Sequence, residues 1–473
     1  MKNKKLLLGL LFFAVMGMMA DMTMAKSSIS IEEEGTTTGW TTVGPNNISG
    51  RVRAAMFDKY NYGVVYAGTV GGLYISVNNG KNWEELNLGS EVQNVTALTQ
   101  DENGIVYVGT GEGFYRVGLH NLDALGKSDA VSGRVGTGVY KLANANYTRE
   151  WAANFATDEE KYAWAKENIT FEHMTSTTVQ SRYDSFDEWA YINAMAYANG
   201  YLYVGTQNAG LKVSQNGQDS FTSVQLEGNS ALAIHDIAVN PNGVVAVAYD
   251  NAGGAVAVNT VENPTTFAKV FNSDVTTAIN QDDAYLGRVK VTFGQNNPDY
   301  LYAFVATPSQ SFVSASEYTQ YDINGYAMGI YRTKSLSDVS WNKITPGTFS
   351  TGNQLGYAMG ITVNDADSNE IVYAFADAVY SGQDVNGTDV FSWSALTSQY
   401  ATDTSGMFVP ANIHNLLFMP NANDMYDSIF MLATTDAGVF SYKYDTIIRT
   451  AIWFPSKGMN TLQAYKVAAT PND

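Results

Sequence analysis

Cysteine is absent from the 473-residue sequence, which excludes disulfides, thiolate metal ligands and cysteine nucleophiles. Charged residues are also few, at 15%, whereas glycine (42 residues) and tyrosine (30 residues) are frequent. Little charge together with 45% hydrophobic residues disfavours disorder and long solvated helices. Frequent glycine and tyrosine suit short strands joined by tight turns. The composition therefore favours an all-β globular protein.

Positive charge is scarce as well. The 27 lysines and arginines are outnumbered by 46 aspartates and glutamates, so the formal net charge is −19. Nucleic acids and anionic membrane surfaces attract proteins by long-range electrostatics, which this charge opposes. We therefore expect no nucleic-acid partner. Acidity keeps an exported protein soluble, and this simple interpretation is favoured over the binding of a basic partner.

Long apolar runs are missing except for residues 6–20 at the N-terminus. Lysines precede this run, and small residues occupy positions −3 and −1 of a cleavage site after Ala25. The run is short for a membrane-spanning helix, which needs about 20 residues. The pattern predicts a signal peptide over residues 1–25 and a flexible segment over 26–38. We expect a secreted, periplasmic or cell-surface protein with no membrane insertion after cleavage.

One strand pattern recurs from residue 39 to residue 473. Segments of alternating character, often followed by Asn, Asp or Pro, begin at residues 52, 95, 192, 234, 289, 358, 413 and 464. A second strand and a glycine-preceded third strand follow most of them. Units of roughly 40 to 50 residues with about four strands each are typical of propeller blades, because one such blade cannot cover both of its own faces. We predict a β-propeller of about seven four-stranded blades over 39–473.

A single helix-like stretch interrupts this pattern, at residues 157–168. Thr157 is followed three residues later by Glu160, which is the signature of a capping box. We therefore predict one short helical insertion in the second blade. A parallel βαβ fold would need such a helix between most of its strands, so the sequence disfavours that fold.

The last repeat stops early. Residues 464–473 begin an eighth unit with only one strand, and residues 39–45 resemble a fourth strand that precedes the first unit. We predict that Tyr465 to Thr470 lie at an edge or seam of the propeller.

The hairpin after the third strand carries a motif in two units. In the first unit its residues are Ser76, Asn78, Gly80 and Trp83. In the third unit a partial match comprises Ser214, Asn216 and Phe221. With these motifs the chain resembles the Asp-box, or BNR-repeat, propellers of exported bacterial proteins, which are related to the sortilin and xyloglucanase propellers. The resemblance implies a structural role: the polar groups satisfy turn backbone, glycine relieves a strained dihedral and the aromatic ring packs between sheets.

The same resemblance raises two classes of enzyme. Xyloglucanase-like propellers use two carboxylates, and the first follows a threonine at the end of the second strand of the opening blade. In this sequence Thr69 is followed by Val70. Sialidases need an arginine triad and a tyrosine nucleophile, and the Arg-Ile-Pro motif of their opening segment is absent. The catalytic residues therefore stay unknown. We predict a non-catalytic propeller that binds a glycan or protein partner, with an exported glycoside hydrolase of the xyloglucanase or sialidase-like class as the alternative.

The binding surface is predicted from propeller geometry. The loops before the first strand and between the second and third strands open on one face, around the central channel. The insertions 111–135 and 307–327 should share that face. The position one residue into each inner strand lies near the channel mouth and is occupied by Arg53, Thr96, Asn193, His235, Lys290, Met359 and His414. The predicted ligand-binding residues are Arg53, His235, Lys290, His414, Tyr318, Tyr321 and Tyr326. Alternatively, these polar groups only satisfy nearby backbone and water.

Metal-binding patterns are weak. The four histidines show no paired spacing. Asp365, Asp367 and Asn369 resemble the start of a calcium loop, because alternate oxygen ligands can wrap a hard cation. They also fall where every repeat makes its first turn, which favours a metal-free turn. We predict no metal and no cofactor, with calcium as the alternative at these three residues.

Overall fold

A computed structural model describes fifteen parts of the chain. They are residues 49–90, 94–113, 133–143, 147–250, 254–280, 286–307, 326–346, 349–352, 354–364, 371–385, 387–401, 406–419, 429–445, 450–459 and 461. The propeller lies within one compact unit, residues 44–473. The predicted signal peptide, the segment 26–38 and the strand at 465–470 lie outside the described residues. No described helix is long and apolar enough to cross a membrane.

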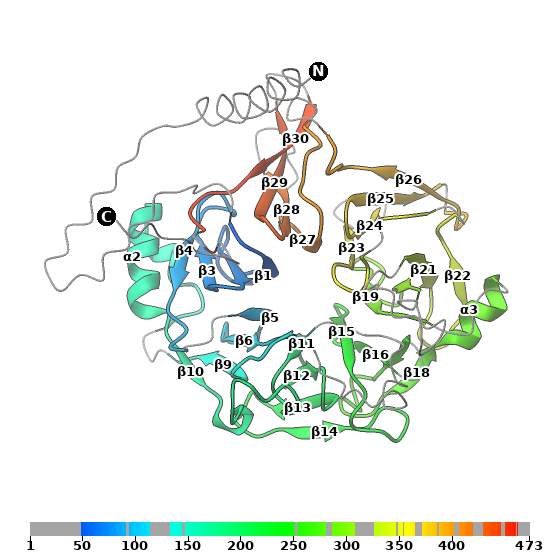
Figure 1. Ribbon diagram of the computed structural model, residues 1–473, viewed down its shortest axis with the longest axis horizontal. Helices are drawn as coiled ribbons and strands as arrows, with labels where there is room; N and C mark the ends of the chain where they lie inside the picture. The colour runs from blue at the N-terminus through cyan, green and yellow to red at the C-terminus, as the bar shows by residue number, and fades with distance from the viewer. Residues whose placement is uncertain are drawn as a thin grey trace, which may run out of the picture. The chain divides into compact units, whose positions relative to one another are not determined.

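Seven four-stranded antiparallel sheets form a propeller ring (Figure 1). Blade 1 comprises β1 (Val52–Phe57), β2 (Val65–Thr69), β3 (Gly72–Ser76) and β4 (Glu84–Leu86). Blade 2 comprises β5 (Val95–Gln100), β6 (Val106–Thr110), β9 (Val139–Leu142) and β10 (Phe171–His173). Blade 3 comprises β11 (Ile192–Ala198), β12 (Tyr201–Thr206), β13 (Leu211–Gln215) and β14 (Thr222–Val224). Blade 4 comprises β15 (Ile234–Val239), β16 (Val245–Asp250), β17 (Gly254–Val258) and β18 (Ala268–Phe271).

The remaining blades repeat this order. Blade 5 comprises β19 (Val289–Phe293), β20 (Leu301–Ala306), β21 (Ala327–Thr333) and β22 (Trp341–Lys343). Blade 6 comprises β23 (Gly360–Asn364), β24 (Ile371–Phe375), β25 (Val379–Asp384) and β26 (Phe391–Ala395). Blade 7 comprises β27 (Ile413–Phe418), β28 (Ile429–Thr435), β29 (Gly438–Asp445) and β30 (Thr450–Pro455). A two-stranded ribbon, β7 (Glu112–Gly113) and β8 (Gly133–Arg134), is inserted in blade 2. The predicted seven-bladed, all-β fold is confirmed.

The second strand of each blade packs between two neighbouring sheets, so both of its faces are apolar. A tyrosine recurs at one position of this strand in five blades and is at most 4% exposed: Tyr66, Tyr107, Tyr203, Tyr302 and Tyr373. This buried ring explains the repeated tyrosine that the sequence pattern shows. The apolar clusters that result extend from blade to blade around the ring.

The turn after the first strand explains why Asp or Asn follows that strand so often. Asp58, Asp101 and Asn240 each accept hydrogen bonds from two backbone N–H groups of the turn, at 2.8 to 3.1 Å. A short side-chain acceptor that bonds to its own turn favours this tight geometry. In two blades the same carboxylate also accepts a hydrogen bond from the recurring tyrosine hydroxyl.

The hairpin between β3 and β4 holds the motif residues of blade 1. Ser76 Oγ accepts hydrogen bonds from the N–H groups of Asn78 (3.3 Å) and Gly80 (2.9 Å). The Trp83 indole N–H donates to the carbonyl oxygen of Gly80 at 3.1 Å, and Trp83 is buried. These contacts close the hairpin and place the ring between sheets.

The partial motif of blade 3 makes fewer contacts of this kind. Ser214 Oγ donates to the carbonyl oxygen of Gln218 at 2.5 Å. Asn216 adopts a positive φ of 54°, and Phe221 packs edge-on against Trp189 with ring centroids 4.9 Å apart.

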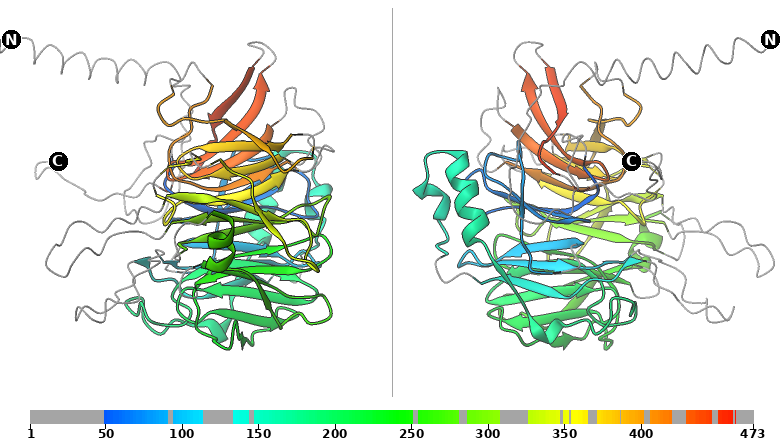
Figure 2. Two further views of the ribbon diagram at one scale, coloured as in Figure 1. Left: turned by 90° about the vertical axis from the view of Figure 1, so that its right-hand side faces the viewer. Right: turned by 60° about the vertical axis from the view of Figure 1, so that its left-hand side comes forward.

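The described residues form two α-helices and two 3-10 helices besides the blade strands. The α-helices are α2 (Asp158–Asn168) and α3 (Ser273–Asn280), and the 3-10 helices are η2 (Trp151–Asn154) and η3 (Thr175–Thr177). Both hydrogen bonds of the predicted Thr157–Glu160 capping box are present at α2. Figure 2 shows α2 outside the strands, where the Tyr162 hydroxyl donates to the carbonyl oxygen of Asn82 at 2.7 Å. Sequence analysis missed α3, because its β-branched residues have low helix propensity.

The ring closes between blades 7 and 1. Trp83 N–H donates to the carbonyl oxygen of Lys457 at 3.0 Å, and Lys457 N–H donates to that of Lys81 at 3.1 Å. Ser456 Oγ donates to the carbonyl oxygen of Gly80 at 2.6 Å. A Cβ on Gly80 would lie 2.7 Å from Leu432 Cδ1 of blade 7. A side chain at this position would therefore force Leu432 to shift within the seam.

We predict that Gly80→Ala destabilises the protein more than Gly89→Ala. Both glycines have a positive φ, 76° and 70°, so each alanine costs about 1 kcal/mol of backbone strain. Only Gly80 faces a neighbour, because a Cβ on Gly89 meets nothing within 4 Å. Overpacking against Leu432 should add about 1 to 3 kcal/mol. Urea denaturation of the two variants measures the difference, and equal midpoints would contradict it.

Candidate functional site

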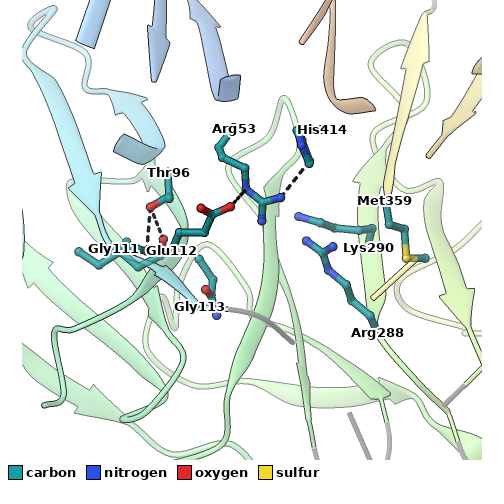
Figure 3. Close-up of a pocket in the computed structure, with 11 residues that line it drawn as sticks. Arg53, Thr96, Gly111, Glu112, Gly113, Arg288, Lys290, Met359 and His414 are labelled. Atoms are coloured by element: carbon teal, nitrogen blue, oxygen red, sulfur yellow. Dashed lines mark hydrogen bonds and ion pairs between the residues drawn. The ribbon is translucent and has the colours of Figure 1, made fainter. Parts of the chain in front are cut away.

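A small cavity lies in the central channel, where inner strands begin. It is lined by Arg53, Thr96, Gly111, Glu112, Gly113, Ile192, Asn193, Arg288, Lys290, Met359 and His414, from blades 1, 2, 3, 5, 6 and 7 (Figure 3). Its volume is about 40 Å³. That is room for a few water-sized groups and is far below the roughly 300 to 1,000 Å³ of a typical drug-sized ligand pocket.

A repeated strand feature brings these side chains together. In six blades the first residue of the inner strand is apolar and fully buried, and the second residue is polar. The strand register shifts at the second residue in five blades, at Arg53, Thr96, Asn193, His235 and His414. A bulge leaves this residue outside the hydrogen-bond ladder and redirects its side chain. The inner strands thus offer variable polar groups at a fixed place.

Glu112 is the carboxylate that lines the cavity, and it is only 2% exposed. Its Oε1 lies 3.1 Å from Arg53 Nε, and its Oε2 pairs with Arg51 Nη2. Figure 3 shows Glu112 facing Arg53. A buried carboxylate needs such cationic partners, because burial alone disfavours its charged form. Glu112 is therefore committed to the two arginines.

His414 is held in one neutral tautomer. Arg53 Nη1 lies 2.9 Å from His414 Nδ1, and since a guanidinium can only donate, Nδ1 accepts. His414 Nε2 therefore carries the proton and donates to Asp436 Oδ1 at 2.8 Å. Burial, reinforced by the charge of Arg53, lowers the pKa of His414 to about 3. The imidazole is uncharged at neutral pH.

Asp436 anchors the far side of this network. Burial acts to raise the pKa of its carboxyl group, but hydrogen bonds from His414, Tyr357 and Asn412 outweigh it and hold the pKa below the ordinary value. The Tyr357 hydroxyl donates to Asp436 Oδ1 at 2.8 Å and accepts from Arg51 Nη1 at 2.8 Å. Blades 1 and 7 and the loop before blade 6 are joined here.

Three cationic side chains converge on the cavity. Arg53 Nη1 and Arg288 Nη1 both donate to the carbonyl oxygen of Tyr357, at 3.1 and 3.2 Å. Lys290 Nζ lies 3.0 Å from Asp236 Oδ1. The pKa of Lys290 is lowered to about 8, mainly by burial and also by the charges of Arg288 and Arg53, while Asp236 opposes the shift. The lining thus holds three basic groups and one carboxylate, in a chain of net charge −19.

The structure brings together three of the predicted ligand-binding residues: Arg53, Lys290 and His414 line the cavity. His235 does not line it, and its surroundings explain why. The ring is only 1% exposed, and its Nδ1 accepts the N–H of Val289 in the next blade at 3.3 Å. Its role is to join blades 4 and 5.

The other predicted residues are placed differently. Tyr326 is 54% exposed, lies directly before β21 and is not part of the cavity lining. Tyr318 and Tyr321 lie outside the described residues, as do Asp365, Asp367 and Asn369 of the calcium pattern. Among the residues that the structure describes, no group of three or more His, Asp or Glu could hold a metal ion.

Sequence reasoning missed Glu112, Arg288, Tyr357 and Asp436. Arg288 stands one position before the inner strand β19. Glu112 lies in β7 of the inserted ribbon, Tyr357 in the loop before β23 and Asp436 in the turn after β28. The predicted residues come from the second position of the inner strands and from tyrosines of the insertion 307–327. Arg288 is adjacent to that strand position, but no pattern in the sequence distinguishes Glu112 or Asp436 from the other acidic residues outside the blade strands.

No family model matches the chain, and no curated protein matches it. Solved structures resemble its fold. An ancestral GH74 enzyme is 17% identical with a TM-score of 0.56, over 89% of this chain and 48% of that one. The GH74 xyloglucanase from Xanthomonas campestris is 14% identical with a TM-score of 0.53, over 89% and 56%. The Niastella koreensis GH74 enzyme is 17% identical with a TM-score of 0.51, over 86% and 54%.

These likenesses show a shared seven-bladed propeller fold, and the chain spans about half the length of the three enzymes. The Asp-box and sortilin-like resemblance stays a prediction.

We predict that acid destabilises the protein through His235. Burial lowers the pKa of this imidazole from about 6.5 to about 4; Arg288 and Lys290 act in the same direction, and Asp250 opposes them. Between these pH values the unfolded chain binds a proton that the folded chain does not, so the free energy of unfolding falls as pH is lowered. The loss should be on the order of 2 to 3 kcal/mol.

Urea denaturation at several pH values tests this for the natural protein and for His235→Gln, whose amide still accepts a hydrogen bond and does not titrate. The variant should lose less stability between about pH 6.5 and 4. Parallel pH curves for the two proteins would show that His235 is not the cause.

Proposed function

We propose that the protein is an exported, non-catalytic binding propeller that holds a glycan on the face where the channel cavity opens. Export is supported by the signal-like N-terminus. A protein partner is the competing outcome, which the experiment below separates.

Exposed aromatic side chains carry this proposal. Tyr183 (79% exposed), Phe186 (62%) and Tyr400 (88%) lie in loops before first strands, and Tyr326 (54%) lies between a second and a third strand. In an up-and-down blade both loop types open on one face, which is also the face of the cavity. Among the described residues, Tyr62 is the one large exposed aromatic in the opposite set of loops. Flat rings with exposed faces suit stacking on sugars.

The loop that carries Tyr183 and Phe186 is fixed to the scaffold. Asn208 Nδ2 donates to the carbonyl oxygens of Ser185 (2.9 Å) and Asp187 (2.8 Å). The Arg182 guanidinium lies 4.9 Å from the centroid of the Tyr183 ring. A loop that is already ordered loses less conformational entropy when a ligand binds.

The cavity favours binding over glycoside hydrolysis. Hydrolysis of this type uses two carboxylates about 5 to 10 Å apart, one on each side of the scissile bond. Glu112 alone among the described lining residues supplies a carboxylate, and it is paired with Arg51 and Arg53. The fold likeness to GH74 enzymes keeps a glycoside hydrolase as the second candidate.

A panel of plant and host polysaccharides tests the proposal, with binding and product release measured on the same samples. We expect retention without release. The double variant Tyr183→Ala/Phe186→Ala should weaken binding of the retained polysaccharide about tenfold or more, since a central aromatic contact is worth about 1 to 2 kcal/mol. Tyr62→Ala is the matched control and should bind normally.

Each other result has a distinct meaning. Product release would support the hydrolase. Equal binding by the double variant and the control would show that Tyr183 and Phe186 do not bind the ligand. If no polysaccharide binds, the ligand is not a glycan, and a protein partner is the remaining candidate.

A further inference from the structure

We propose that the channel cavity is a binding site for a single carboxylate group, supplied by a uronic acid of the glycan. This inference rests on the proposed function for the source of the carboxylate. The basic residues of the cavity support an anionic group as the ligand. The exposed aromatic residues on the same face support a sugar as the molecule that bears this group.

The first argument is the convergence of like charges. Arg53 and Arg288 donate to one carbonyl oxygen, that of Tyr357, so their guanidinium groups are held close together. Lys290 lies near both, and their positive charges disfavour its protonated form. Arg53 and Lys290 reach the cavity from different blades, and Figure 3 shows Lys290 and Arg288 pointing toward the side on which Arg53 lies. Collecting buried cations costs free energy. Glu112 and Asp236 offset part of this cost, and a further anion between the cations would offset more of it.

The second argument is that a carboxylate matches these donors. Guanidinium groups form paired N–H···O bonds with the two oxygens of a carboxylate, and charge-assisted bonds of this kind are roughly twice as strong as neutral ones. Thr96 and Asn193 add neutral polar groups to the lining. Glu112 pairs with Arg51 and Arg53, which shows that guanidinium groups at this place in the channel bind a carboxylate.

The third argument is size. A cavity of about 40 Å³ admits a group of a few atoms and not a sugar ring. A ligand must therefore insert one small charged group and leave the rest of its structure on the surrounding face. Acidic sugars carry such a group on a ring that the aromatic side chains of that face can stack against. The two features fit one acidic glycan.

The test compares polygalacturonate with its methyl ester, which has the same backbone without the charge. We expect the acid to bind about tenfold or more tightly than the ester. Lys290→Met keeps the apolar stem and should weaken binding of the acid about tenfold without changing binding of the ester. The matched control is Lys81→Met, in the β3–β4 hairpin on the face opposite the cavity. It should change binding of neither the acid nor the ester.

Acetate titration tests the cavity without the sugar. At constant ionic strength, acetate should raise the melting temperature of the natural protein and of Lys81→Met, and acetamide should not. Lys290→Met should not respond. A larger effect of sulfate than of acetate would overturn the choice of a carboxylate.

The outcomes separate this inference from the proposed function. Equal binding of acid and ester, weakened only by Tyr183→Ala/Phe186→Ala, would retain the glycan-binding function and overturn the carboxylate site. Stabilisation by acetate without binding of polygalacturonate would support the carboxylate site and overturn its uronic-acid source. No acetate effect and no preference for the acid would overturn the inference as a whole.

The pH dependence gives an independent readout. Lys290 is surrounded by Asp236, Arg288, Arg53, Glu112 and the neutral His235 and His414. With its pKa near 8, it loses its proton as pH rises through that value. Acetate affinity should therefore fall above about pH 8, and a constant affinity across this range would contradict a role for Lys290.

Discussion

The structure depends on one constraint: a four-stranded blade is apolar on both faces and must be covered on both. Five buried tyrosines in second strands show how little of each sheet meets water. Such blades are stable only when the ring closes, so the contact of blade 7 with blade 1 matters as much as any sheet. Backbone hydrogen bonds of Lys457 with Lys81 and Trp83, and the absence of a Cβ at Gly80, make that closure.

The inner strands show how a repeated scaffold carries a site that is not repeated. The first residue of the strand is buried and fixed, whereas the bulged second residue is free of the sheet ladder. The residue type at this position can therefore differ between blades while the sheet stays the same. Arg53, Asn193 and His414 occupy this place in three blades, and their different chemistry meets in one channel. The rigidity comes from the sheets, and the polar chemistry of the channel lining comes from the bulges.

The fold could be predicted from the sequence because its signals are local. Three such signals are the strand segments of alternating character, an Asp or Asn at the first turn and a tyrosine in the second strand. Each has a direct cause in the structure, as Asp58 and Tyr66 show for the last two. The site could be predicted only in part. Whether a bulged side chain turns to the channel or to the next blade depends on that blade, which is why His235 bonds to blade 5 whereas Arg53 lines the cavity. Glu112 lies on a ribbon that belongs to one blade alone, so no repeat marks it.

The bond between Arg53 and His414 spans 361 positions of the chain. Its partners lie in the first and last blades, so it forms only after the whole ring has assembled. Contacts with such large sequence separation are slow to form, because the loop entropy is lost before they are made. The channel cavity is therefore a late product of folding. A chain cut or stalled before blade 7 lacks His414, so the proposed recognition of a ligand through this cavity is confined to molecules that have folded to completion.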